Sequence, residues 1–180
     1  MPKLGKKKRR EARKRAEALV TEVENRSKFL TGLRTVLKYF SRLDYKSDLE
    51  KFVPDLGEAF GTPLEVLHIV GEELGKKLKK QTEQAFEILH AMWDRGSREE
   101  RLVACQILQR VAPVASQQVE EFVWDHLHEL GNWEVCDALA TKALGPILLH
   151  NTSSHLSKVK KMVKDKDKWV RRVGILSLLS

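Results

Sequence analysis

The sequence lacks the motifs on which most cofactor, metal and redox chemistry depends. It has no CxxC pair, no glycine-rich phosphate-binding loop and no GxSxG elbow, and its histidines show no metal-ligand spacing. The two cysteines, Cys105 and Cys136, lie in apolar helical patterns that are typical of reduced, buried thiols. We therefore expect no cofactor, no metal ion and no disulfide.

Long apolar runs are also absent. No stretch reaches the roughly 18 residues that a membrane-spanning helix needs, and the first residues are charged where a secretory signal would be apolar. The chain is therefore expected to be soluble and intracellular, in the cytoplasm or nucleoid or in a eukaryotic nucleus, with no membrane partner. Its 180 residues are enough for one sizeable domain.

Strand patterns are missing as well, because apolar residues recur at spacings of three and four rather than two. Polar residues that can cap helix N-termini are Thr62, Ser97, Asn132 and Asp167. Thr62 is followed by Pro63 and Glu65, which together form a capping box with a proline at the first helical position. We expect the helix after Asn132 to end at Gly145-Pro146.

The tryptophans indicate a repeat. Trp93, Trp133 and Trp169 are separated by 40 and 36 residues, close to the period of HEAT-type helical pairs. The predicted fold class is all-α, a HEAT-like solenoid of antiparallel helix pairs with a concave DNA-binding face. A plain helical bundle is the alternative.

Positive charge is concentrated at the two ends of the chain. Residues 1–16 hold nine basic groups and one acid, which equals the whole net charge of +8. Residues 158–172 hold eight basic groups and two acids, so the segment between is acidic. Such polarity suits a surface that meets a polyanion. We interpret residues 1–16 as a basic, flexible arm, either a phosphate binder or a solubility or nuclear-address tail, and residues 17–180 as the folded domain.

Two short segments bring chemistry-bearing residues onto helical faces. Trp133 and Asp137 are four residues apart, and Trp169 and Arg172 are three apart, so each pair shares one face of its helix. If the two helices occupy equivalent places in successive repeats, both indoles, the acid and the guanidinium line a single surface. The alternative for Trp133 is a packing anchor.

The charged residues have structural alternatives too. Asp137 is also compatible with a surface carboxylate that pairs with Lys142 or Lys168. Of Arg171 and Arg172, one is expected to point outward, because adjacent helical positions diverge by about 100°.

Together these motifs resemble the bacterial HEAT-repeat alkylpurine DNA glycosylases, also called DNA alkylation repair enzymes. The resemblance covers roughly residues 55–180, and the separation of 35 residues between Asp137 and Arg172 agrees with it. The motifs that carry it are Gly61-Thr62-Pro63, Met92-Trp93-Asp94, the arginine-rich helix Arg98 to Arg110, NWEVCD and KWVRR.

The resemblance implies a monofunctional glycosylase that hydrolyses the N-glycosidic bond of N3- or N7-alkylated purines in double-stranded DNA, without base flipping. Asp137 would be the catalytic carboxylate, Trp133 and Trp169 would flank the deoxyribose, and Arg172 would hold the DNA nearby. Further contacts to the DNA backbone would come from Lys166, Lys168 and Arg171. The partner is alkylated duplex DNA, and we expect a monomer.

The sequence also departs from this family. Members usually extend some tens of residues further, and their third active-site aromatic lies in that extension. The last residues, VGILSLLS, are apolar and have no closing cap, so we expect the domain to be incomplete at this end. The alternative functions are a non-catalytic binder of damaged or branched DNA and a HEAT-type protein-interaction scaffold.

Overall fold

The computed structural model describes residues 4–150 and 152–179, and all regular secondary structure in these residues is helical. The helices are α1 (Lys6–Val20), α2 (Arg26–Tyr39), α3 (Leu43–Phe52), α4 (Leu64–Leu78), α5 (Thr82–Asp94), α6 (Arg98–Val111), α7 (Ser116–His126), α8 (Trp133–Ala138), α9 (Gly145–His150), α10 (Thr152–Met162) and α11 (Lys168–Ser177). A short 3₁₀ helix, η1 (Leu127–Glu129), follows α7, and a π-helix, η2 (Leu139–Leu144), joins α8 to α9. In this part of the chain no helix is both long and apolar enough to cross a bilayer.

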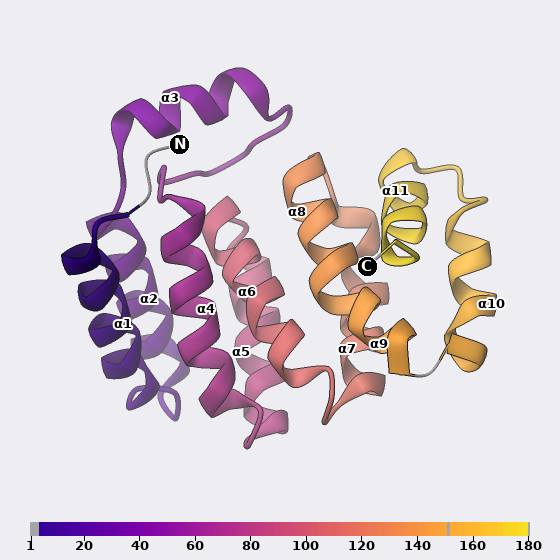
Figure 1. Cartoon of the computed structure of the whole chain (residues 1–180), viewed down its shortest axis with the longest axis horizontal. Helices are drawn as coiled ribbons and strands as arrows, with labels where there is room; N and C mark the ends of the chain where they lie inside the picture. The colour runs from indigo at the N-terminus through magenta and orange to yellow at the C-terminus, as the bar shows by residue number, and fades with distance from the viewer. Residues whose placement is uncertain (1–3, 151, 180) are drawn as a thin grey trace.

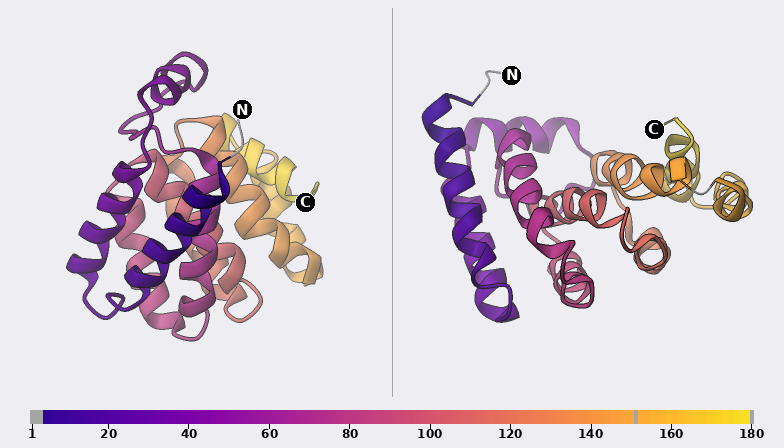
Figure 2. Two further views of the ribbon diagram at one scale, coloured as in Figure 1. Left: turned by 60° about the vertical axis from the view of Figure 1, so that its left-hand side comes forward. Right: turned by 60° about the horizontal axis from the view of Figure 1, so that its bottom comes forward.

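The helices stack in two layers (Figure 1). Helices α1, α4, α6, α8 and α11 follow one another in the first layer, run parallel and have their N-termini along one edge. Helices α2, α5 and α7 form the second layer behind them. Helix α3 stands apart from both layers (Figure 2) and packs through its own small apolar cluster of Tyr45, Leu49 and Val53. The prediction of an all-α, helical-repeat fold is confirmed, whereas the HEAT-type assignment and the concave binding face stay predictions.

Contacts between neighbouring repeats show the period directly. Four side-chain contacts across successive repeats join residues 35 or 36 positions apart, namely His90 with His126, Arg98 with Glu134, Glu120 with His155, and Asp137 with Arg172. The backbones approach closely where α4 meets α6, because a Cβ on Gly71 would lie only 2.4 Å from Cβ of Gln106. Glycine therefore allows these two parallel helices to pack in register.

The predicted N-caps are confirmed at three positions. The side chain of Ser97 accepts a hydrogen bond from the N–H of Glu100, that of Asn132 from Val135, and that of Asp167 from Trp169. Each side chain satisfies one of the free N–H groups at a helix start.

The predicted capping box at Thr62 is wrong. Helix α4 begins at Leu64 with Pro63 as its N-cap and no side-chain cap. The Thr62 hydroxyl is buried and donates instead to the carbonyl of Leu37, at 2.7 Å. This bond satisfies a carbonyl in the last turn of α2, so a tertiary contact has displaced the local cap.

The predicted helix end at Gly145-Pro146 is also wrong. The chain continues from α8 through the π-helix η2 directly into α9. Pro146, which has no N–H to donate, lies in the first turn of α9 directly after the π-helix. The wide π-helical turn before it provides this new start.

The N-terminal basic segment is not a flexible arm from Lys6 onward, and that prediction is corrected for residues 6–16. They belong to α1, in which Ala12 and Ala16 are fully buried. Small side chains on this face let α1 pack closely against α4. Two ion pairs hold the helices together, Arg9 with Glu65 at 2.5 Å and Arg13 with Glu73 at 3.1 Å. Residues 1–3 of the predicted arm lie outside the described residues.

Candidate functional site

The acid and the arginine singled out in the sequence meet in the structure. Arg172 of α11 donates to both carboxylate oxygens of Asp137 on α8, from Nε to Oδ1 at 2.5 Å and from Nη2 to Oδ2 at 2.9 Å. The carboxylate is therefore held in the planar fork of the guanidinium. Its partner is neither Lys142 nor Lys168, so the structural alternative for Asp137 named the wrong cations.

This ion pair is accessible to solvent. The side chains of Arg172 and Asp137 are 43% and 32% exposed. The hydrogen bonds that Arg172 donates to Asp137 raise the pKa of its guanidinium, whereas partial burial acts to lower it. Because pairs at this exposure are screened by water, we expect this one to contribute at most about 1 kcal/mol to stability.

Both predicted tryptophans lie in the first turns of the two helices that carry the pair. Trp133 is the first residue of α8, is 37% exposed, and donates from Nε1 to the carbonyl of Phe52 at 3.4 Å. Trp169 is half-buried and packs against the main core, with the Lys168 ammonium 4.8 Å from the centre of its ring. Each indole thus precedes a member of the ion pair by one helical turn.

The residues predicted to bind the DNA backbone differ in whether their charged groups already have partners within the protein. Arg171 donates from Nη1 to the carbonyls of Asp165 and Lys166, both at 2.8 Å, and so holds the loop before α11. Lys166 and Lys168 are exposed, and neither makes an ion pair within the described parts of the chain. Arg172 is the more exposed of the two adjacent arginines, in agreement with the expected divergence.

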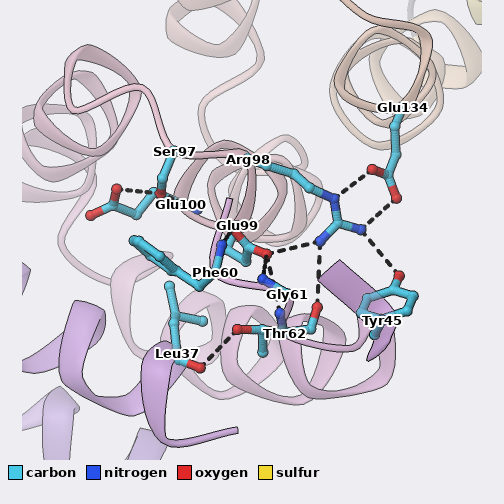
Figure 3. Close-up of polar contacts among 10 residues, drawn as sticks. All are labelled: Leu37, Tyr45, Phe60, Gly61, Thr62, Ser97, Arg98, Glu99, Glu100 and Glu134. Carbon is cyan, nitrogen blue, oxygen red and sulfur yellow. Dashed lines mark hydrogen bonds and ion pairs between the residues drawn. The ribbon is translucent and has the colours of Figure 1, made fainter. Parts of the chain in front are cut away.

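A buried ionic network joins α6 to α8 and α3 (Figure 3). It was not predicted from the sequence. The side chain of Arg98, at the start of α6, is fully buried and donates to both carboxylate oxygens of Glu134, each at 2.6 Å. It also donates to the Tyr45 hydroxyl at 3.3 Å. Burial alone would lower the pKa of Arg98, but the hydrogen bonds and charge of Glu134 raise it.

The neighbouring carboxylate extends this network to the backbone. Glu99 accepts hydrogen bonds from the N–H groups of Phe60, Gly61 and Thr62, at 2.9, 3.0 and 3.2 Å, and pairs with Arg98 at 3.1 Å. Gly61 has a φ of 79°, a conformation that side chains with a Cβ rarely adopt. The segment before α4 is therefore fixed on α6.

The network fixes α8, the helix that carries Trp133 and Asp137. Glu134 directly follows Trp133 and precedes Asp137 by about one turn, so the pair with Arg98 anchors the start of α8. One sequence signal could have revealed it: an arginine in the first turn of a helix opposes the helix dipole and needs a nearby acid. That signal does not identify Glu134 as the acid.

The geometry suits stabilisation of a cation. A fixed, accessible carboxylate lies one turn beyond an exposed indole, and both charge and the quadrupole of an aromatic face attract positive charge. Neither needs to exchange a proton to do so.

Comparison with known sequences gives one family. A family model described as DNA alkylation repair enzyme matches residues 33–180. The matched segment begins within α2 and includes α8 and α11, whereas α1 lies outside it. No curated protein and no solved structure gives a significant match.

Proposed function

The chain belongs to the family of DNA alkylation repair enzymes, and from this premise we propose that it is a DNA glycosylase. Its substrates are N3- and N7-alkylated purines in duplex DNA, and it acts as a monomer inside the cell, where that substrate lies. The observation that carries the proposal is the accessible Asp137–Arg172 pair, with Trp133 and Trp169 in the turns before it.

The proposed reaction is hydrolysis of the N-glycosidic bond. An alkyl group on N3 or N7 makes the purine cationic, so the bonding electron pair leaves with the base, which departs neutral. Positive charge then develops on the sugar as an oxocarbenium ion. Asp137 stabilises this charge and orients a water molecule, which adds to the sugar carbon and loses its proton to solvent. Because the base is already a good leaving group, the reaction needs no pocket around a flipped base.

The other residues bind and position the DNA. Trp133 and Trp169 flank the deoxyribose and offer electron-rich faces to the developing cation. Arg172 fixes the orientation of the carboxylate and contacts the DNA backbone nearby. Lys166, Lys168 and Arg171 contact phosphates on the same side, which places the duplex without reading its sequence.

The test is the release of 7-methylguanine and 3-methyladenine from methylated duplex DNA. We expect Asp137→Asn to lower the rate of release by about 100-fold or more while DNA affinity is retained, since one preorganised electrostatic contact is worth about that factor. Asp48→Asn, which changes an exposed carboxylate on α3, is the matched control. Equal rates for the wild type and Asp137→Asn would refute the assigned role.

A second candidate is a non-catalytic binder of damaged or branched DNA. It is favoured by one observation: both oxygens of Asp137 are already engaged by Arg172 in the free protein. On this hypothesis the wild type releases no base, and Asp137→Asn binds DNA as the wild type does.

A further inference from the structure

The basic helix α1 lies outside the segment that matches the family, yet it packs in the same layer as the candidate site. We propose that the outward face of α1 is a second phosphate-binding surface, which holds duplex DNA about one helical turn from Asp137. This inference rests on the proposed function in one respect, namely that the ligand is duplex DNA. It requires no catalysis.

The basic side chains of α1 fall into two groups. Arg9, Arg13 and Arg15 are paired with Glu65, Glu73 and Glu11. The second group is exposed and makes no ion pair among the described residues; it consists of Lys6, Lys7, Lys8, Arg10 and Lys14. Only the second group is therefore available to a partner.

Three members of the free group form one stripe. Lys6, Arg10 and Lys14 follow each other at intervals of four, so they lie on one helical face, turned away from the buried Ala12 and Ala16. We call these three residues the α1 basic face. Its charges repel one another, and Lys6 stands at the positive end of the helix dipole, so the arrangement is unfavourable to the helix itself. A polyanion bound along this face would remove both penalties.

The acidic side chains of α4 determine which side of α1 keeps free positive charge. Glu65 and Glu73 neutralise the side of α1 that adjoins α4. Glu72 is likewise paired with Arg110 of α6. The acids of α4 are thus already neutralised. Besides the lysines at the C-terminal end of α4, unpaired cations among the described residues lie on α1 at one end of the layer and at the other end at Lys166, just before α11, and Lys168, its first residue. A duplex that crosses the layer would meet free positive charge at both ends.

The size of the layer matches the DNA repeat. Helix α1 is separated from α8 by α4 and α6 (Figure 1), and packed helices lie about 8–10 Å apart. The α1 basic face is therefore about 24–30 Å from α8 and about 32–40 Å from α11. One turn of B-DNA rises about 34 Å. Because Asp137 lies on α8, phosphates about 7–9 base pairs from the lesion would face α1, at about 3.4 Å per base pair.

The experiment measures the affinity for undamaged duplex DNA as a function of salt, using the whole chain and duplexes of about 30 and about 8 base pairs. The test variant is Lys6→Gln/Arg10→Gln/Lys14→Gln. The matched control is Lys77→Gln/Lys79→Gln/Lys80→Gln, which removes three exposed charges near the C-terminal end of α4, on the opposite edge of the layer (Figure 1). Glutamine is a good helix former, and circular dichroism of both variants checks that α1 is retained.

With the long duplex, we expect the test variant to flatten the slope of log affinity against log salt by about 2–3, and the control to leave it unchanged. A short duplex cannot reach both basic ends at once, so its affinity should fall at most about twofold. An unchanged slope for the test variant, or an equal change for the control, would overturn the proposal. So would an equal loss on both duplexes. Because the DNA is undamaged, the experiment measures binding alone. Its result therefore does not depend on whether the protein excises bases.

Discussion

Two arginine–carboxylate forks join successive repeats, and they differ in burial. Arg98 holds Glu134 from inside the molecule, where its side chain is 0% exposed, whereas Arg172 holds Asp137 at the surface, where it is 43% exposed. The chemistry is the same, since both guanidinium groups donate from Nε and Nη2 to two carboxylate oxygens. Burial therefore separates the roles of the two pairs.

The comparison shows which charges are available for function. The buried pair has exchanged water for a complete set of protein partners, and removal of one partner leaves a charge without compensation. The exposed pair has given up little hydration, so its members can exchange partners with DNA at low cost. The first pair fixes α8, and the second presents a carboxylate on it.

The largest effect is expected from Glu134→Ala. It leaves the Arg98 guanidinium buried with only Glu99, Tyr45 and a backbone carbonyl as partners, so the free energy of unfolding should fall by about 3–5 kcal/mol. Urea denaturation of the wild type and the variant measures this difference.

The control for this prediction replaces both partners. Arg98→Met/Glu134→Leu should recover part of the lost stability, because a buried pair can be exchanged for apolar groups of similar volume while Glu99 keeps its three backbone N–H donors. A loss below about 1 kcal/mol in Glu134→Ala would contradict the distinction between the two forks.

The pair that joins α7 to α10 should give an intermediate effect. The carboxylate of Glu120 is nearly buried and lies 2.8 Å from both His155 Nδ1 and Lys158 Nζ. Burial acts to raise the pKa of Glu120, but the hydrogen bonds from Lys158 and His155 outweigh it and lower that pKa. Glu120→Gln should therefore cost about 1.5–3 kcal/mol near neutral pH.

The pH dependence of this effect follows from the direction of the shift. Because the folded pKa of Glu120 lies below the unfolded value of about 4.3, its contribution is present above that value and is lost as the pH falls through the folded pKa. The difference between wild type and Glu120→Gln, followed by thermal denaturation from pH 7 to pH 3, should shrink accordingly. A difference that grows toward acid would contradict the prediction.

Local signals in the sequence were sufficient for much of the fold. Ser97, Asn132 and Asp167 act as caps because each has its bond partner within three residues. The shared surface of Asp137 and Arg172 was also predictable, since it needs only a repeat period and a helical face.

Features that depend on distant partners were not predictable. The Thr62 hydroxyl bonds to Leu37, 25 residues away, and no local pattern shows that a tertiary carbonyl competes for it. Helix α1 reads as an arm because its charge dominates its composition, while the two alanines that bury it against the core carry little hydrophobic signal. Arg98 needs a partner that is 36 residues away.

The smallest effect on stability is expected at the exposed pair of Asp137 and Arg172. Asp137→Asn should change the free energy of unfolding by less than about 1 kcal/mol, because the fork is exposed and screened. Added salt should shrink even this difference, since salt weakens the attraction between solvent-exposed charges. Urea denaturation at low and high salt measures both effects. A loss as large as that of Glu134→Ala would instead mean that Asp137 holds α8 to α11, and any loss of base release in Asp137→Asn would then reflect a displaced helix rather than a missing charge.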